Sequence, residues 1–187
     1  MNNNDFKASQ TIEIGDKRFK LYLSTAEIQQ IVSQLANRIS NDLRDENPLF
    51  LAVLNGSFIF VADLMRELDF DAEISFVKMS SYLGTQSTGK VEKLIGINES
   101  IENRTIVVLE DIIDTGISME AMIQQLKAYN PKNIHLCTLL FKPGKFVKNY
   151  HIRYIGKEID DDFIVGYGLD YDGKGRKYSQ IYTICDR

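Results

Sequence analysis

The fold is decided by residues 105–118, which read Thr-Ile-Val-Val-Leu-Glu-Asp-Ile-Ile-Asp-Thr-Gly-Ile-Ser. Apolar side chains fill positions 106–109 without a break, and such a run is typical of a strand that is buried on both faces. Two acids follow at the expected end of the strand, and a third, Asp114, precedes a helix predicted over about 118–129. Strand, acidic turn and helix together predict one unit of an α/β fold.

The same alternation of strands and helices runs through most of the chain. Further buried strands are predicted at residues 49–54, 74–79, 134–141 and 163–167, and a further amphipathic helix at 58–68. Ser24 and Glu27 form a predicted capping box for a helix that reaches about residue 43, and residues 11–23 are predicted to form a short hairpin. The pattern predicts a central, mostly parallel sheet flanked by helices, with ligands bound at the carboxyl ends of its strands.

Length and composition narrow the class of protein. The chain has 187 residues, of which 44% are hydrophobic and 26% charged, and this fits one soluble domain. No apolar run approaches the roughly 18 residues that cross a bilayer, and no secretory signal is present, so no membrane partner is expected. A net charge of -4 argues against a nucleic-acid partner. Two cysteines without zinc-type spacing predict a reducing, cytoplasmic location.

The acidic turn offers two kinds of polar group in one place. Backbone N–H groups at a helix N-terminus bind phosphate, Gly116 allows a close approach, and Thr115 and Ser118 add hydroxyl donors. The acids can accept hydrogen bonds from sugar hydroxyls or take up a proton, so a ribose 5-phosphate would satisfy both groups. In the alternative, Asp114 merely caps the helix and the other acids are solvated, which leaves two acids at the end of a buried strand unexplained.

Residues 107–116 resemble the phosphoribosyl-diphosphate signature of type I phosphoribosyltransferases, in the form found in hypoxanthine-guanine phosphoribosyltransferases. A Walker loop is excluded because its Gly-rich run and Lys-Ser/Thr ending are missing. The resemblance implies a type I phosphoribosyltransferase fold with one domain over 1–187, a core over about 25–160 and a small hood from about 11–23 and 161–187. It also implies purine salvage, in which phosphoribosyl diphosphate and hypoxanthine and/or guanine give IMP or GMP and diphosphate.

The resemblance assigns roles within the signature. Glu110 and Asp111 would hold the ribose 2- and 3-hydroxyls, and Asp114 would be the general base near purine N7, which makes it the expected catalytic residue. The 5-phosphoribosyl group as a whole would be bound by Glu110, Asp111, Asp114, Thr115, Gly116, Ile117 and Ser118.

Two other segments resemble diphosphate-binding parts of the same enzymes. Leu54-Asn55-Gly56 is similar to the diphosphate loop, which implies a cis Leu54–Asn55 peptide; the alternative is an ordinary Asn-Gly turn. Residues 81–90 resemble the mobile catalytic loop, in which Ser81 and Tyr82 would be lid residues that bind diphosphate. Taken alone, the same segment would be interpreted as a surface linker.

The purine end of the site is expected at Lys142, Phe163 and Ile164. By resemblance, Lys142 would donate to the 6-oxo group, Phe163 would stack on the ring, and the Ile164 backbone would meet its edge. Taken alone, a Phe is more often a core residue and a Lys at a strand end is more often solvated. These three residues favour a 6-oxopurine only in combination with the acidic turn.

Magnesium is the implied cofactor. Asp170 would reach the ion directly or through water, Glu110 and Asp111 are further candidate ligands, and Arg176 would contact the diphosphate. Mg²⁺ suits such a site because it keeps waters and is shared between carboxylates and substrate phosphates. Residues 172–175 are smaller than the aromatic-rich segment of vertebrate enzymes and are similar to bacterial-type relatives.

Two other functions stay open from the sequence. A regulator with this fold would sense phosphoribosyl diphosphate and bind nucleic acid, although the net negative charge and the lack of an added helix-turn-helix argue against it. A transferase specific for xanthine or a pyrimidine is the nearer alternative. Small-molecule substrates are the expected partners, and the resemblance implies a homodimer or homotetramer.

Overall fold

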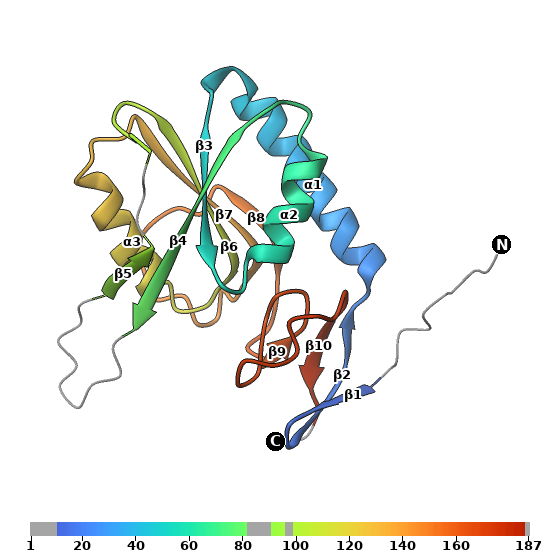
Figure 1. Cartoon of the computed structure of the whole chain (residues 1–187). Coiled ribbons are helices and arrows are strands. Elements are labelled where there is room, and N and C mark those ends of the chain that lie inside the picture. The colour runs from blue at the N-terminus through green and yellow to red at the C-terminus, as the bar shows by residue number, and fades with distance from the viewer. Residues whose placement is uncertain (1–10, 82–90, 96–98, 186–187) are drawn as a thin grey trace.

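The strands form two separate sheets in the computed structural model, which describes residues 11–81, 91–95 and 99–185 (Figure 1). The larger sheet has the strand order β5-β4-β3-β6-β7-β8. Its strands are β3 (Leu49–Leu54), β4 (Glu73–Ser81), β5 (Val91–Ile95), β6 (Thr105–Ile113), β7 (Asn133–Phe141) and β8 (Tyr154–Glu158). Only β5, at one edge, pairs antiparallel with its neighbour; the other pairs are parallel. The predicted, mostly parallel sheet is thereby confirmed.

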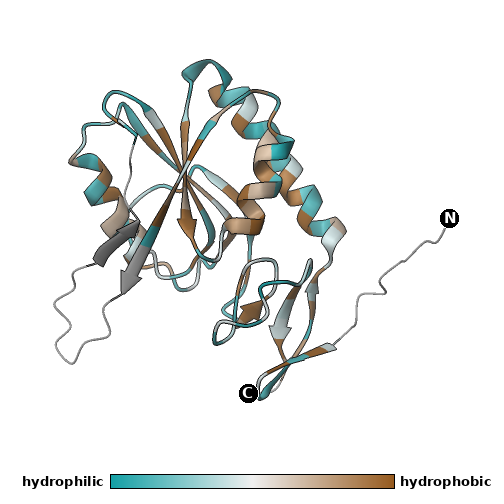
Figure 2. Ribbon diagram, in the orientation of Figure 1, coloured by the Kyte–Doolittle hydropathy of each residue, from teal (hydrophilic) through white to brown (hydrophobic). Residues whose placement is uncertain are grey.

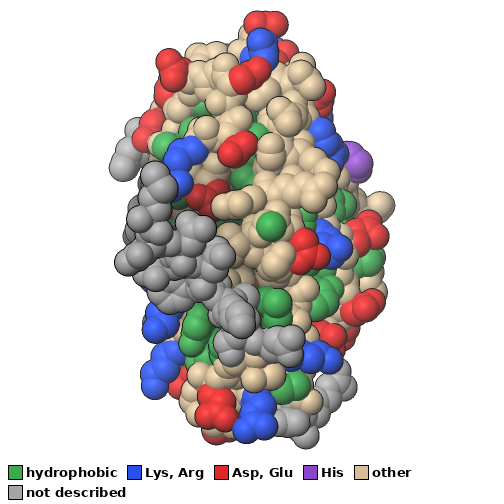
Figure 3. All heavy atoms as spheres, turned by 90° about the vertical axis from the view of Figure 1, so that its right-hand side faces the viewer, with side chains coloured by type: hydrophobic (Ala, Val, Ile, Leu, Met, Phe, Trp, Pro, Cys, Tyr) green, Lys and Arg blue, Asp and Glu red, His purple; other side chains and the backbone are tan. Residues whose placement is uncertain are grey.

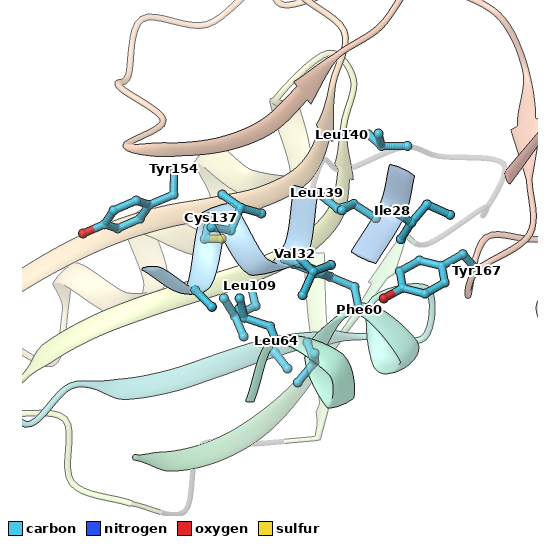
Figure 4. Packing of buried hydrophobic residues seen from close by; sticks show 14 of the residues in the cluster. Ile28, Val32, Phe60, Leu64, Leu109, Cys137, Leu139, Leu140, Tyr154 and Tyr167 are labelled. Carbon is cyan, nitrogen blue, oxygen red and sulfur yellow. The ribbon is translucent and has the colours of Figure 1, made fainter. Parts of the chain in front are cut away.

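Helices cover both faces of this sheet, and the alternation of side chains along its strands explains why. Helices α1 (Thr25–Leu43) and α2 (Phe58–Glu67) lie on one side and α3 (Ile117–Lys127) on the other (Figure 1). Phe50 points into the core under α1 and α2, whereas Leu51 points into the core under α3. Figure 4 shows the core under α1 and α2. Figure 2 shows the apolar strands that this core shares with the core under α3. Both faces of β3 are therefore apolar, as its continuous apolar run predicts.

Helix α1 begins where the capping box predicts. Ser24 is the N-cap: its hydroxyl accepts from the Glu27 N–H at 3.3 Å, and its own N–H donates to the Glu27 carboxylate at 2.8 Å. The helix continues to Leu43, and a short 3-10 turn, η1 (Arg44–Glu46), leads into β3. Both the predicted start and the predicted end of this helix are confirmed.

The smaller sheet is built from the two ends of the described chain. Strands β1 (Thr11–Ile14), β2 (Lys17–Leu23), β10 (Ile181–Ile184) and β9 (Ile164–Val165) follow one another in the sheet and all pair antiparallel. Ile14, Phe19, Val165 and Tyr182 form its own small core. In Figure 1 this sheet lies beyond the end at which β3 finishes, where a hood over the carboxyl edge is expected.

One strand prediction is wrong, and one parallel strand was not predicted. Residues 163–167 were expected as the fifth strand of the parallel sheet, but only Ile164 and Val165 are extended, and they pair with β10 in the hood. Gly166 and Gly168, with φ of 97° and 98°, end the strand at once. The fifth parallel strand is β8, which the sequence does not reveal because this short edge strand has only two large apolar residues and ends in two exposed charged ones.

The outer surface carries charges of both signs. On the face shown in Figure 3, Lys and Arg side chains lie among Asp and Glu, and neither sign forms a continuous patch on the described part of that face. None of the helices in the described ranges has the length and apolar character that a membrane span requires.

Candidate active site

Glu110 and Asp111 lie on strand β6 itself, because the strand continues to Ile113 and does not end at Leu109 as predicted. Both side chains lie near the carboxyl end of this strand, and their carboxylates are close enough to interact with each other. Glu110 lines a cavity of about 280 Å³. Asp111 is only 6% exposed and packs against the backbone of Gly56. The acids are therefore fixed by a strand and not by a flexible turn.

The residues after β6 form the kind of helix N-terminus that the sequence predicts, one suited to bind phosphate. Gly116 is the N-cap of α3 and has φ 80°, a left-handed conformation that glycine adopts without steric cost. The helix begins at Ile117, one residue earlier than the predicted Ser118. Thr115, Gly116 and Ser118 line the same cavity as Glu110. The first N–H groups of α3, which have no partner within the helix, thus lie beside hydroxyls and a carboxylate.

Two carboxylate oxygens in this cavity lack a hydrogen bond. Glu110 Oε2 and Asp114 Oδ1 are both buried and have no partner among the described residues. Burial raises the pKa of Glu110 well above its ordinary value, and the neighbouring Asp111 charge raises it further. Burial also raises the pKa of Asp111. A buried carboxylate oxygen without a partner is unfavourable, so these two oxygens could accept a hydrogen bond from a ligand or bind a cation, although the other Asp114 oxygen lies near two lysines.

The loop after β3 has the cis peptide that the resemblance implies, between Leu54 and Asn55. Gly56 follows it, and a side chain there would place Cβ 1.7 Å from Asp111 Oδ2. A Cβ on Gly168, from the hood, would lie 2.0 Å from the Gly56 carbonyl oxygen. The loop at residues 54–56, which resembles a diphosphate loop, is thus packed between β6 and the hood. Only glycine fits at position 56.

Two lysines and one further acid, Asp161, surround the expected base, Asp114. Lys142 is 6% exposed, and its Nζ lies 3.9 Å from both Asp114 Oδ2 and Asp161 Oδ1. Lys145 Nζ lies 2.5 Å from Asp161 Oδ1 and 3.6 Å from Asp114 Oδ2. Lys142 is therefore not a solvated strand end. The sequence reasoning missed Lys145 and Asp161, although the repeat of Lys at a spacing of three after β7 was a signal for Lys145.

Phe163 and Ile164 offer different groups to the site. The Phe163 ring is 45% exposed, and its centroid lies 6.3 Å from that of Phe19 and 5.9 Å from that of Tyr171. Ile164 is 6% exposed, and its side chain belongs to the main core, so only its backbone is available to a ligand. An open aromatic face beside a strand edge matches the stacking and edge contacts that the resemblance implies.

Asp170 and Arg176 pair with each other in the hood. Asp170 Oδ1 lies 2.6 Å from Arg176 Nη2, and Arg176 also donates to the Gly168 carbonyl at 2.6 Å. In the described ranges, no three His, Cys, Asp or Glu side chains are grouped to hold a metal, so Glu110, Asp111 and Asp170 are not a ready-made cage. Mg²⁺ nevertheless fits, because it needs only one or two carboxylates beside waters and phosphate oxygens.

The predicted lid lies mostly outside the described residues. Tyr82 is among the residues not described, and of Ser81 only the backbone is described, at the end of β4. Their assignment to diphosphate binding stays a prediction.

Fold and site together define a phosphoribosyltransferase. The chain matches the phosphoribosyl transferase domain over residues 21–172. The hypoxanthine-guanine phosphoribosyltransferase of Mycobacterium tuberculosis is 37% identical over 186 residues, which cover 95% of this chain and 92% of the relative. The chain belongs to the hypoxanthine-guanine phosphoribosyltransferase family.

Solved structures agree with this assignment. A hypoxanthine phosphoribosyltransferase from Staphylococcus aureus has a TM-score of 0.84 and 33% identity, over 89% of this chain and 91% of its own. A hypoxanthine-guanine phosphoribosyltransferase from Bacillus anthracis has a TM-score of 0.83 and 37% identity, over 92% of this chain and 100% of its own. The type I fold with a hood, expected from the acidic signature, is confirmed.

Proposed function

We propose that the chain transfers the 5-phosphoribosyl group from phosphoribosyl diphosphate to hypoxanthine and/or guanine, giving IMP or GMP and diphosphate. One observation carries the proposal: the unpartnered oxygens of Glu110 and Asp114 line a single cavity with the N-terminus of α3. A phosphate would bind at the helix end, a ribose hydroxyl would donate to Glu110, and the purine N7–H would donate to Asp114. The names of the relatives support the same reaction.

The binding roles follow the chemistry of each group. Thr115, Gly116, Ile117 and Ser118 would bind the 5-phosphate through N–H and hydroxyl donors, and Glu110 and Asp111 would accept from the ribose hydroxyls. The loop at Leu54, Asn55 and Gly56 would hold the diphosphate with Ser81, Tyr82 and Arg176. On the purine side, Lys142 would donate to the 6-oxo group, Phe163 would stack on the ring and the Ile164 backbone would meet its edge.

The reaction would be driven by positioning and electrostatics. As the C1–O bond to diphosphate breaks and the purine nitrogen bonds to C1, positive charge grows on the ribose. Glu110 and Asp111, on the rigid strand β6, would stabilise that charge, and Asp114 would take the N7 proton while Lys142 and Lys145 compensate its negative charge. Magnesium, bound with the diphosphate beside Asp170, would neutralise the departing oxygens.

Base preference separates this proposal from the nearest alternative. The buried Lys142 ammonium favours a base with an exocyclic oxygen, and the open Phe163 face fits a bicyclic ring. Catalytic efficiencies should be compared for hypoxanthine, guanine, xanthine and uracil. Efficiencies for hypoxanthine or guanine at least about tenfold above the other two would support the proposal, and a preference for xanthine or uracil would contradict it.

The remaining features of the proposal concern the whole molecule. We infer a single functional unit with the core at about 25–160 and the hood at about 11–23 and 161–187, working in the cytoplasm as a homodimer or homotetramer. The free thiols of Cys137 and Cys185 suit a reducing compartment. Light scattering coupled to gel filtration would give the subunit number, and a monomer would contradict the inferred assembly.

A further inference from the structure

We propose that Tyr150 and Phe146, in the segment between β7 and β8, are positioning residues that hold the phosphate-binding turn in its binding geometry. This inference rests on the proposed function, because the turn at Thr115 and Gly116 is the part expected to bind the 5-phosphate. Neither residue is part of the predicted site. Neither lines the cavity at this turn, and both contact the turn at Gly116.

The contacts act directly on two carbonyl groups of the turn. The Tyr150 hydroxyl donates to the Gly116 carbonyl at 2.9 Å, and the Val147 N–H donates to the Thr115 carbonyl at 3.3 Å. Because a peptide unit is planar and trans, fixing a carbonyl fixes the opposite direction of the N–H on the next residue. The clamp, which we define as residues 146–150, thus helps to aim the N–H groups of Gly116 and Ile117. It acts together with the helical bond from the Glu120 N–H to the Gly116 carbonyl at 3.0 Å.

Aromatic packing gives the clamp its rigidity. A Cβ on Gly116 would lie 2.5 Å from Phe146 Cε2 and 2.6 Å from Tyr150 Oη, so the two rings close against this glycine. The Phe146 ring meets Tyr150 edge-on at 5.1 Å and Phe141, at the end of β7, at 5.2 Å. The turn is therefore braced through the clamp against the central sheet.

An ion pair also holds the clamp in place, and the Tyr150 hydroxyl stays protonated. Lys148 Nζ lies 2.7 Å from Glu120 Oε2, which ties the clamp to the first turn of α3. Burial, with the nearby Glu120 charge, raises the pKa of Tyr150 to about 12. The hydroxyl therefore stays a donor throughout the neutral range, as a permanent brace requires.

Calorimetric titration with ribose 5-phosphate tests the clamp, since this ligand needs neither a purine nor turnover. Tyr150→Phe removes only the hydroxyl and should weaken binding roughly two- to tenfold, the worth of one neutral hydrogen bond. Tyr154→Phe is the matched control, because the Tyr154 hydroxyl also makes one hydrogen bond, 3.0 Å to Asp42, away from the turn. Its affinity should equal that of the original chain.

The kinetic signature should match the binding result. Tyr150→Phe should raise KM for phosphoribosyl diphosphate by a similar factor, with kcat and KM for the purine changed less than about twofold. Phe146→Leu, which keeps an apolar side chain but removes the ring, should show the same pattern. A folded Tyr150→Phe protein that binds ribose 5-phosphate as tightly as the original chain would overturn the clamp. A chain that binds this ligand but turns over no purine would contradict only the proposed reaction.

Discussion

Asp170 Oδ1 lies 2.6 Å from Arg176 Nη2, so the residue expected to reach the metal and the residue expected to reach the diphosphate neutralise each other in the hood. Arg176 also donates to the Gly168 carbonyl, and Gly168 packs against Gly56 of the diphosphate loop. The hood therefore places this ion pair next to a glycine that packs against the loop at which the diphosphate is expected.

Replacing Arg176 with Met should weaken phosphoribosyl diphosphate binding. Hydrogen bonds to charged groups contribute about 1.5–3 kcal/mol, which corresponds to an increase in KM of roughly 10- to 150-fold. Lys174→Met is a matched control, since Lys174 is an exposed cation of the same loop. Steady-state kinetics at fixed ionic strength would measure both. Equal effects of the two changes would show that only the net charge of the loop matters.

Gly56→Ala should disrupt both stability and binding. The new Cβ would lie 1.7 Å from Asp111 Oδ2, so the loop or the buried acid must move, at a cost of roughly 1–3 kcal/mol in the free energy of unfolding. Gly144→Ala is the control, because a Cβ there meets nothing within 4 Å. Urea denaturation would measure both variants. An unchanged midpoint for Gly56→Ala would disprove the close packing of loop, β6 and hood.

Asp114→Asn should abolish proton transfer and leave substrate binding nearly intact. General base catalysis contributes about 10²- to 10⁴-fold, so kcat should fall at least about 100-fold while the Kd for phosphoribosyl diphosphate changes little. Asp161→Asn is informative beside it, since Asp161 contacts the same two lysines as Asp114. A comparable fall in kcat for both variants would mean that the carboxylates serve only to hold the lysines.

The buried Glu110 should make the metal-free protein less stable as pH rises. Its pKa in the fold is raised above the ordinary value of 4.5, so the folded state holds a proton that the unfolded state has lost. The stability that this proton contributes is complete below about pH 4.5 and is lost as the pH rises through the raised pKa. Glu110→Gln should flatten this loss and raise Tm at pH 7.5 by at least about 2 °C.

A thermal melt series from pH 5 to pH 8 without metal would check this expectation. Glu67→Gln, at an exposed position on α2, should follow the original chain throughout. If Glu110→Gln loses stability in parallel with the original chain, burial of the acid is not the cause. Glu110→Gln is expected to gain stability and lose activity, as is common when a polar group that binds a ligand destabilises the fold.

Local signals in the sequence predicted most of the main sheet. Strands β3, β6 and β7 are largely buried, so each contains a run of mostly apolar residues, and the Ser24–Glu27 capping box places the start of α1. Strand β8 was missed because its five residues include no run of apolar side chains. Strand β9 was misplaced because it pairs with β10, which in turn pairs with β2 from the other end of the chain. Local patterns do not reveal such long-range pairing.

Some parts of the candidate site could likewise be predicted from the sequence, and others could not. The acidic signature and the Gly116 turn stand together in the sequence, so their cavity could be predicted, and the cis Leu54–Asn55 peptide followed from the resemblance. The contacts that hold the site in place and set its charge could not be predicted from the sequence. Tyr150 reaches Gly116 across 34 residues, and Lys145 meets Asp161 only through the folding of two loops.

Diphosphate release tests the central claim most directly. The purified chain would be mixed with phosphoribosyl diphosphate, Mg²⁺ and hypoxanthine or guanine, and diphosphate would be measured beside the nucleotide formed. One diphosphate is expected for each IMP or GMP formed, with release dependent on the purine. Binding of phosphoribosyl diphosphate without purine-dependent release would contradict it and would point to a sensor in place of an enzyme.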